Sequence, residues 1–394
     1  MRSKSPRRRR VLKPNMEKRL SETVPMSKLH EDQAVLYTTI FVGNPPQPLD
    51  VQLDTASSDL WTPISGCTNC NTTLIQTQSD HTSSLFNISS STTFIPTSRG
   101  VKIAYGDGTG VGGVVSKDTV SVGDFVVHNQ TLIAVESVQG QFDTAGVFGL
   151  GWPTLSTSRG NPWWINAIDQ FDEPEFGLYL TSPTNVTIAP AGQLTLGGRN
   201  ESLLDGEPQF VRLLEQSFWA VPLTQVTVTT NSSSATNTAS TSSSSATVSL
   251  AGDDAVAILD CGSELIYGPT VYVDAVYASI EGAVKNEADG DDDDGWLLPC
   301  DTRASLVFSF GTVDVVLPSS LLVQPSPIAQ SPATSTSRTS TSATPSTTAR
   351  RYCSGTLVGD NDASTTNGAS PAWILGHAFL KATYTVFRKG TSPS

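Results

Sequence analysis

Short runs in which apolar and polar residues alternate cover most of the chain from about residue 35 onward, and Gly, Pro, Asn and Ser separate them. Clear examples are LYTTIFVG, VKIAYGDG, DTVSVGDFVVHNQTLIAV and AGQLTLGG. Alternation with period 2, rich in β-branched residues, predicts strands with one buried face. Helical periodicity is confined to two short stretches, near NPWWINAIDQF and VYVDAVYASIEGAV. The pattern therefore predicts a mainly β protein.

Two tracts of Ser and Thr interrupt this pattern, at residues 227–248 and 325–350. Their composition offers little apolar surface to bury, so we expect surface loops or disordered insertions, of a kind that carries O-linked sugars.

The chain also contains an internal duplication. LDTASSDLW at residues 53–61 aligns with LDCGSELIY at residues 259–267, and each copy is followed by an apolar-apolar-Gly motif, VFGL at 147–150 and ILGH at 374–377. A mainly β unit that occurs twice predicts two similar lobes. Each lobe would contribute one carboxylate, Asp54 or Asp260, to a shared site.

Two carboxyl groups held within hydrogen-bond distance share one proton over a wide pH range, because both cannot ionise comfortably. The ionised member can take a proton from water while the protonated member polarises a carbonyl under attack. The residues around each aspartate suit this chemistry: Ser57 and Ser263 can orient the outer carboxylate oxygens, and Thr55 can tie the two loops together.

These motifs together resemble a pepsin-like aspartic protease, a eukaryotic family, here of fungal type; the similarity covers residues 35–388. The resemblance implies a bilobed acid-protease fold of two similar β-barrel-like lobes with the active-site cleft between them. The lobes would span residues 33–207 and 208–394, the second with both Ser/Thr-rich insertions. Asp54 and Asp260 would be the catalytic pair, supported by Thr55, Ser57, Cys261 and Ser263.

Other segments match the same family in the expected order. VKIAYGDGTGVGGVVSKDTVSVG resembles the hairpin flap that closes over substrate, which implies substrate-binding roles for Tyr105, Gly106, Asp107, Gly108 and Thr109. Trp61 matches a tryptophan whose N–H meets the flap tyrosine. The resemblance also implies disulfides between Cys67 and Cys70 and between Cys300 and Cys353, with Cys261 unpaired.

Other interpretations of these motifs have less support. A lone Asp-Thr-x-Ser more often forms a turn or helix cap, but the duplication argues against that. Gly108, Gly110 and Gly113 fit a dinucleotide-binding pattern, yet a β-favouring run follows them instead of a helix. No metal-ligand spacing and no serine-hydrolase motif occurs, so we expect neither a metal nor a cofactor.

Three residues near the site depart from the family pattern. Ala56 stands in place of a loop glycine, which would cost about 1 kcal/mol if φ were positive. Cys261 stands opposite Thr55, so the tie between the loops is expected to be weaker on one side. His377 stands where the family often has aspartate, and an imidazolium there would favour ionisation of the pair. The alternative to an aspartic endopeptidase active at acidic pH is therefore an impaired relative that binds peptides or proteins without cleaving them.

Charge is distributed unevenly. Of 24 Lys/Arg and 37 Asp/Glu, residues 1–32 hold ten and four, which leaves a body with 14 basic and 33 acidic residues. Such a body repels nucleic acid, so residues 1–32 are interpreted as a basic arm or a pro-segment remnant, with Lys18–Arg19 as a possible cleavage point.

Composition also bears on compartment and partners. Asn-x-Ser/Thr acceptors occur at Asn71, Asn87, Asn129, Asn185, Asn200 and Asn231. With the paired cysteines they indicate a secreted glycoprotein, extracellular or vacuolar, although no signal peptide is visible. We expect a monomer acting on polypeptides, with no membrane anchor, because no apolar stretch approaches a membrane span.

Overall fold

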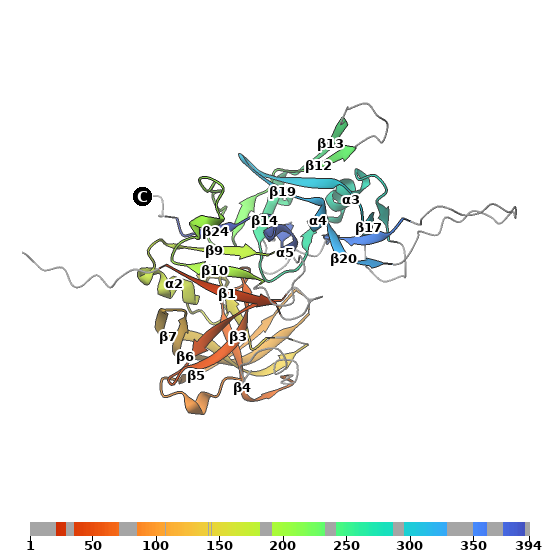
Figure 1. Ribbon diagram of the computed structural model, residues 1–394. Coiled ribbons are helices and arrows are strands. Elements are labelled where there is room, and N and C mark those ends of the chain that lie inside the picture. Colours follow the sequence, from red (N-terminus) through yellow and green to blue (C-terminus); the bar gives the residue numbers. More distant parts are fainter. Residues whose placement is uncertain are drawn as a thin grey trace, which may run out of the picture.

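The computed structural model describes residues 21–28, 35–70, 85–106, 108–140, 142, 144–181, 191–232, 242–286, 295–328, 350–360 and 373–390. The fold is mainly β and bilobed, as predicted (Figure 1). Most strands drawn in red to yellow form one lobe, and most of those drawn in green to blue form the other; the blue strand β24 is an exception, because it joins the sheet of the first half. The exact division at residues 207 and 208 stays a prediction.

Eleven strands form the largest sheet, in the order β24-β9-β10-β1-β2-β3-β8-β4-β7-β6-β5. Ten of them come from the first half of the chain. Their bounds are β1 Glu22–Lys28, β2 Leu36–Val42, β3 Gln47–Asp54, β4 Leu60–Thr68, β5 Ile95–Ala104, β6 Gly110–Val122, β7 Phe125–Gln139, β8 Val147–Gly149, β9 Glu175–Leu180 and β10 Gly192–Leu196. The eleventh, β24 (Thr385–Arg388), comes from near the end of the chain and pairs with β9.

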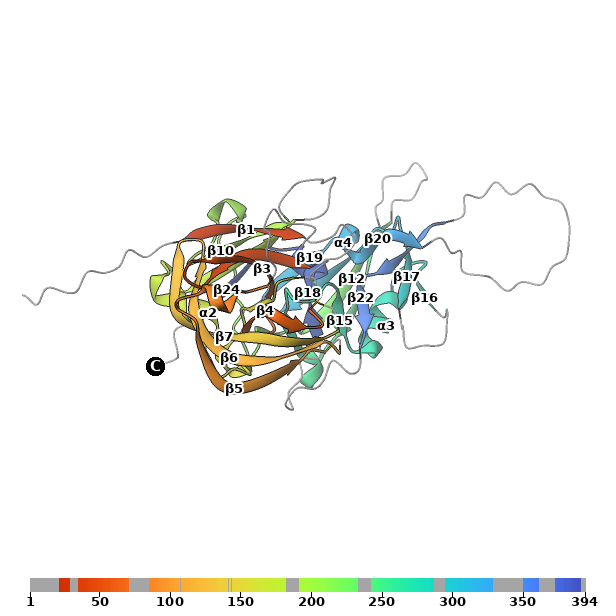
Figure 2. The same cartoon turned by 90° about the horizontal axis from the view of Figure 1, so that it is seen from below.

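The second half of the chain forms three smaller sheets, seen from a second direction in Figure 2. The first, in the order β11-β14-β23-β15-β22, contains β11 Ala220–Pro222, β14 Val256–Leu259, β15 Ile266–Gly268, β22 Leu357–Gly359 and β23 Trp373–Leu375. The second, β13-β12-β18-β19, contains β12 Gln225–Ser232, β13 Ser242–Ser249, β18 Ala304–Phe310 and β19 Val313–Leu317. The third, β16-β17-β21-β20, contains β16 Val284–Lys285, β17 Trp296–Pro299, β20 Val323–Ile328 and β21 Tyr352–Gly355.

Within the described ranges the helices are few and short. The α-helices there are α2 Trp163–Ala167, α3 Thr270–Ala278, α4 Ser319–Leu322 and α5 His377–Leu380. The 3₁₀ turns are η1 Ile88–Ser90, η2 Pro153–Leu155, η3 Ile168–Gln170, η4 Glu201–Leu203 and η5 Gly252–Ala255. The first two α-helices lie in the two stretches whose periodicity predicted helix. In the part of the chain that the structure describes, no helix has the length and apolar character of a membrane span.

Strand register confirms the internal duplication. In the first half, β3 pairs parallel with β8 so that Leu53 faces Phe148, and β4 pairs antiparallel with β8 so that Leu60 also faces Phe148. In the second half, β14 pairs parallel with β23 so that Leu259 faces Leu375, and β15 pairs antiparallel so that Ile266 faces Leu375. Each aspartate therefore ends a strand beside an equivalent parallel neighbour.

Aromatic rings join the two halves of the chain. Trp152 lies 5.0 Å from Trp219 between ring centroids, and Trp219 lies 5.0 Å from Phe387. Trp219 also donates from Nε1 to the carbonyl of Leu150, at 2.9 Å. All three rings are buried. Large buried rings contribute most to such contacts, so this cluster fixes how the two lobes pack.

Residues 1–32 are not wholly a basic arm, because Glu22–Lys28 form β1. This strand pairs with β10 and with β2, and it buries Val24 and Met26 at alternate positions. The sequence of this strand gives only a weak indication of β-structure, because it is seven residues long and includes a proline. Residues 1–20, which include Lys18 and Arg19, and residues 29–32 lie outside the described residues.

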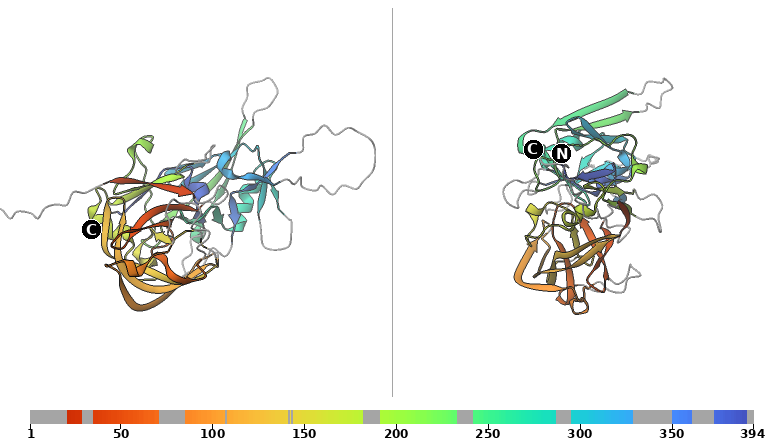
Figure 3. Two further views of the ribbon diagram at one scale, coloured as in Figure 1. Left: turned by 60° about the horizontal axis from the view of Figure 1, so that its bottom comes forward. Right: turned by 90° about the vertical axis from the view of Figure 1, so that its left-hand side faces the viewer.

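The prediction of loops or disordered insertions is also wrong for the described parts of both Ser/Thr-rich tracts. β12 and β13 run antiparallel through residues 227–248, and they project as a two-stranded ribbon (Figure 3). Threonine and valine favour strands, and Val226 and Val228 bury one face. Residues 325–328 belong to β20, whereas 233–241 and 329–349 lie outside the described residues.

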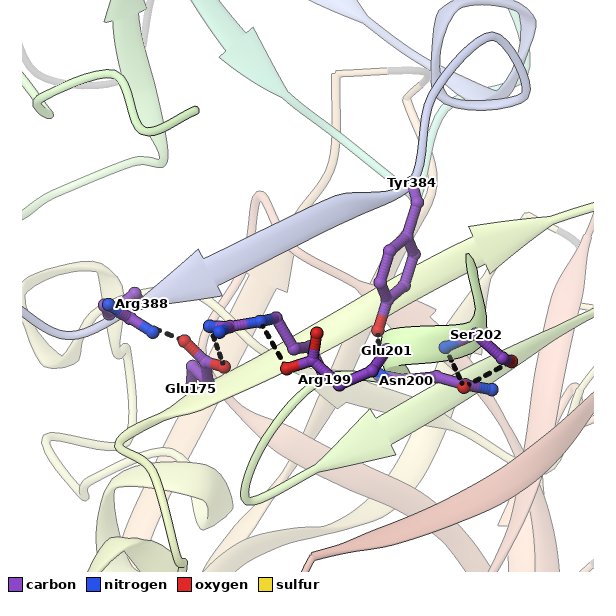
Figure 4. A network of polar contacts seen from close by, with 7 residues as sticks. All are labelled: Glu175, Arg199, Asn200, Glu201, Ser202, Tyr384 and Arg388. Atoms are coloured by element: carbon purple, nitrogen blue, oxygen red, sulfur yellow. Dashed lines mark hydrogen bonds and ion pairs between the residues drawn. The ribbon is translucent and has the colours of Figure 1, made fainter. Parts of the chain in front are cut away.

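A polar network holds β24 against the large sheet (Figure 4). Glu175 on β9 is completely buried, and its carboxylate binds Arg388 of β24 at 2.5 Å and Arg199 at 3.2 Å. The hydroxyl of Tyr384 accepts from the backbone N–H of Asn200 at 2.8 Å. Arg388 also lies 4.4 Å from the ring centre of Phe210. A buried carboxylate needs such partners, because an unpaired buried charge is strongly destabilising.

We predict that Glu175→Gln lowers the free energy of unfolding by roughly 1–3 kcal/mol, since the two arginines lose a buried partner but stay partly hydrated. Glu201→Gln is the matched control, because Glu201 binds the same Arg199 at 3.0 Å with 70% of its side chain exposed. The control should cost less than about 1 kcal/mol. Urea unfolding measures both, and equal losses would contradict the prediction.

Candidate active site

Asp54 lies at the end of β3, where the chain turns back toward β4. Its Oδ1 accepts from the backbone N–H of Ala56 at 2.8 Å, and its Oδ2 accepts from the hydroxyl of Ser57 at 2.5 Å. The backbone carbonyl of Asp54 accepts from Leu150 at 2.7 Å. The carboxylate is buried and held on both oxygens.

Asp260 follows β14 and repeats this arrangement. Its Oδ1 accepts from the N–H of Gly262 at 2.7 Å, and its Oδ2 accepts from the hydroxyl of Ser263 at 2.6 Å. Both serines therefore lie where the sequence predicted them, one on the outer oxygen of each aspartate.

The two carboxyl groups face the same point. A methyl group built on Gly262 would lie 2.9 Å from Oδ1 of Asp54 and 3.1 Å from Oδ1 of Asp260. Glycine is required here because a side chain would enter the space that the two carboxyl groups share. The fold thus brings together two aspartates that are 206 residues apart in the sequence.

Burial raises the pKa of both carboxyl groups above the ordinary value of aspartic acid. For Asp260, burial and then the negative charge of Asp54 raise the pKa to about 7. The hydrogen bond between the two carboxyl groups lowers the pKa of Asp54 and raises that of Asp260. The pair therefore retains a shared proton well above the pH at which an exposed aspartic acid would lose its own.

Thr55 ties the two loops together. Its hydroxyl donates to the carbonyl of Leu259 at 2.8 Å and accepts from the N–H of Cys261 at 2.9 Å. Burial, and then the negative charges of Asp260 and Asp54, raise the pKa of the Cys261 thiol, whereas hydrogen bonding with Thr55 lowers it. Sulfur is a weak acceptor, so the tie is asymmetric, as the sequence led us to expect.

Ala56 is accommodated without backbone strain. The residues other than glycine with positive φ are Asn69, Asn129 and Arg159 among those the structure describes, and Ala56 is not one of them. The cost expected for alanine at a left-handed position therefore does not arise.

The predicted flap is the hairpin of β5 and β6, which pair antiparallel up to Ala104 and Gly110. Between them, Tyr105 donates its backbone N–H to Thr109 at 2.9 Å, and Gly108 has a φ of 81°. Gly106 and Gly108 are exposed. Asp107 lies outside the described residues.

Trp61 and Tyr105 meet as the resemblance implied. Trp61 donates from Nε1 to the hydroxyl of Tyr105 at 2.6 Å. The ring of Phe142 contacts both, with centroids 5.0 Å from Trp61 and 5.7 Å from Tyr105. This aromatic group holds the turn end of the hairpin.

Both predicted disulfides are present, Cys67–Cys70 and Cys300–Cys353, and Cys261 is a buried free thiol. The first disulfide packs beside the Trp61 cluster, and the second joins the strand region of β17 to β21. His377 lies beside the Asp260 loop. No group of three or more His, Cys, Asp or Glu with metal-binding geometry occurs within the described ranges.

Sequence reasoning missed three residues that shape the site. Gln52 donates from Nε2 to the carbonyl of Gly262 at 3.3 Å, so it links the two loops. Buried Asp59 accepts from the backbone N–H of Thr157 at 2.7 Å and thereby anchors the end of the first loop. Phe142 is the third. Gln52 alternates with buried Val51 and Leu53, a pattern that indicates only a solvent-facing polar residue.

Comparison with known proteins agrees with this geometry. The family model described as eukaryotic aspartyl protease matches residues 36–393. Major aspartyl peptidase 1 of Cryptococcus neoformans is 27% identical, over 94% of this chain and 70% of that protein. Pepsin A of Sus scrofa is 28% identical over 90% and 79%. Vacuolar protease A of Arthroderma otae is 30% identical over 62% and 56%.

We predict opposite outcomes for two substitutions in the loops. Gly262→Ala places a methyl 2.9 Å from Asp54 Oδ1, so turnover should fall by about 100-fold or more. Ala56→Gly should keep turnover within a few fold and cost about 0.5–1 kcal/mol of stability, because it only adds freedom to the unfolded chain. Steady-state peptide hydrolysis and thermal unfolding measure both, and a fully active Gly262→Ala variant would refute the argument.

The raised pKa of Asp260 also predicts how stability depends on pH. The folded state keeps this proton up to about pH 7, whereas in the unfolded chain the group has the model value of 3.8. Its contribution is therefore fully present below about pH 4 and is lost as pH rises through 7. Asp260→Asn removes this loss and should gain a few kcal/mol relative to the native chain between these limits. Denaturant unfolding at pH 4 and 7.5 measures the gain, and parallel pH curves would contradict it.

Proposed function

The chain belongs to the eukaryotic aspartyl protease family and is a peptidase that hydrolyses peptide bonds, and on that premise we propose that Asp54 and Asp260 are its catalytic pair. The observation that carries this assignment is the shared buried space above Gly262, into which both carboxyl groups point. Paired carboxyl groups with one shared proton can supply a base and an acid at once.

The proposed reaction is direct attack of water on the peptide carbonyl. Asp54, the ionised member, removes a proton from the water, and the oxygen forms a bond to the carbonyl carbon. Asp260 gives its proton to the carbonyl oxygen, which produces a neutral tetrahedral diol. Asp54 then gives the proton that it took from water to the amide nitrogen, and Asp260 takes back a proton from a diol hydroxyl. The C–N bond breaks, which leaves a carboxylic acid and an amine and restores both carboxyl groups to their starting states.

Ser57 and Ser263 keep the pair oriented during this cycle, because each donates to an outer oxygen that does not face the partner. Thr55 and the backbone of Cys261 keep the loops in register. Positioning of this kind accounts for a large share of catalytic rate, since small displacements of reacting groups are costly.

The flap is proposed to close over an extended peptide that lies in the cleft between the lobes. Tyr105, Gly106, Asp107, Gly108 and Thr109 would contact the substrate, with Trp61 holding Tyr105 from behind. Glycines at the tip let the backbone approach a peptide closely. An extended substrate presents backbone groups that pair with such a hairpin.

The alternative, an impaired relative that binds peptides without cleaving them, has less support. It was suggested by Ala56 and Cys261, but Ala56 is unstrained and the N–H of Cys261 still bonds to Thr55. Both aspartates and both serines keep the symmetric contacts that hydrolysis needs. An endopeptidase is therefore the better proposal.

We further propose a monomeric enzyme of the secretory pathway, extracellular or vacuolar, that does not bind nucleic acid. The acidic body, the two disulfides and the Asn-x-Ser/Thr acceptors support this, and Asn87 and Asn129 are exposed. One relative is named a vacuolar protease. Glycosylation and export are parts of this proposal.

The test uses denatured globin as substrate at pH values from about 3 to 8, which span the reference carboxylate pKa and the raised one. We expect cleavage that a transition-state peptide inhibitor such as pepstatin blocks. The rate of cleavage should fall as the pH rises through about 7, because Asp260 then loses the proton that it must donate.

Asp54→Asn and Asp260→Asn should each reduce turnover by a factor of about 1,000 or more without loss of fold. Asp118→Asn is the control for a buried aspartate in the same half of the chain, since Asp118 accepts hydrogen bonds from Thr93 and Thr119 away from the pair. A folded wild-type protein that binds the inhibitor but never cleaves would favour the alternative.

A further inference from the structure

His377 is a buried ionisable residue that the proposed reaction does not use. Only 2% of its surface is exposed, and it begins α5 directly after β23. We propose that His377 is a positioning residue, which holds the Asp260 loop through the carbonyl of Cys261. This inference rests on the proposed catalytic pair.

The first support is the way α5 is joined to the loop. The backbone N–H groups of Gly376, His377 and Ala378 donate to the carbonyls of Leu265, Ser263 and Glu264 at 3.1, 2.9 and 3.0 Å. The start of this helix is therefore attached directly to the segment that follows Asp260.

The second support is the side-chain contact itself. Nε2 of His377 lies 2.7 Å from the carbonyl oxygen of Cys261. A carbonyl oxygen can only accept, so Nε2 carries a proton and donates it. This hydrogen bond is buried, where it is stronger than in water and where its loss leaves a carbonyl without its donor.

This contact is one of three hydrogen bonds from side chains to backbone carbonyls of the Asp260 loop. Side chains donate to the carbonyls of Leu259, Cys261 and Gly262, and the donors are Thr55, His377 and Gln52 respectively. Thr55 and Gln52 belong to the first half of the chain, whereas His377 reaches the loop from α5. The carbonyls on either side of Cys261 are thus held from the first lobe, and the one between them is held from the second.

Comparison of the two copies shows that the histidine occurs only in the second half of the chain. The registers that pair Asp54 with Gly149 and Leu259 with Leu375 make Leu150 the counterpart of His377. Leu150 is buried and has no side-chain donor. The half with leucine has Thr55 in its loop, and the half with histidine has Cys261, whose sulfur is a weak partner. The imidazole therefore gives the Cys261 carbonyl a side-chain donor from a position where the first half, with leucine, has none.

The consequence concerns Asp260, the proposed acid of the pair. The orientation of the Asp260 carboxyl group depends on the backbone of Cys261 and Gly262, because the N–H of Gly262 donates to Oδ1 of Asp260. Loss of the His377 contact would let this backbone shift while the fold and the substrate contacts of the flap persist.

The experiment compares His377→Leu, which copies Leu150, with His377→Gln, whose amide can still donate to the same carbonyl. For the leucine variant we expect kcat to fall by about 10- to 100-fold with KM within about threefold. The glutamine variant should recover most of kcat. His128→Leu is the matched control, because His128 is exposed on β7 and should leave kcat unchanged.

Inhibitor affinity and thermal unfolding accompany the kinetics. A merely structural role would lower stability and leave kcat per folded molecule unchanged in both variants, and that result would overturn the proposal. So would equal losses in the leucine and glutamine variants.

A readout independent of activity separates this proposal from the proposed function. In protein labelled with ¹⁵N-histidine, we expect one Nε2-bound proton that exchanges slowly with solvent and is absent in both His377 variants. An Nε2 without a protected proton would overturn the positioning role even in an active enzyme. A protected proton in a chain that cleaves nothing would instead count against the catalytic pair and leave the contact established.

Discussion

The carboxyl groups of Asp54 and Asp260 face one point above Gly262, and most of the surrounding structure serves to keep them there. Two buried carboxyl groups resist being brought together, because burial disfavours their charges and their charges repel. The fold offsets this with one shared proton and with fixed donors, two on each aspartate. A raised pKa of about 7 for Asp260 is the electrostatic result of that confinement.

Duplication gives the site its symmetry, and a few substitutions take part of that symmetry away. Both aspartates end equivalent strands, and both receive an N–H from two residues further on and a hydroxyl from three residues further on. Among the positions at which the copies differ, however, are three where the first has alanine, threonine and leucine and the second has glycine, cysteine and histidine. The first two differences lie within the loops that carry the carboxyl groups, and the third lies in the segments that pack against those loops. Because the two aspartates have different neighbours, their pKa values can differ, so that one acts as the base and the other as the acid.

The site depends on contacts far from it, because each lobe supplies only one carboxyl group. Few polar contacts cross between the loops themselves, chiefly those of Thr55 and Gln52. Their geometry is maintained by the larger aromatic cluster of Trp152, Trp219 and Phe387. Glu175, with Arg199 and Arg388, then holds β24 in the sheet of the other half (Figure 4). Since packed interiors deform little, these distant contacts fix the distance between the carboxyl groups.

The sequence by itself determined the mainly β class, the duplication, the two aspartates with their serines, the hairpin with Tyr105, and both disulfides. The class, the duplication and the aspartates with their serines follow from local periodicity and from short motifs that occur twice. The hairpin with Tyr105 and the disulfides follow from the resemblance to a known family. Only the tertiary structure decided that Glu22–Lys28 form a strand, that Ala56 is unstrained, and that Gln52, Phe142 and His377 contact the site. The reason is physical: a backbone angle or a hydrogen bond across 200 residues depends on how distant segments pack, and no local pattern of residues encodes that packing.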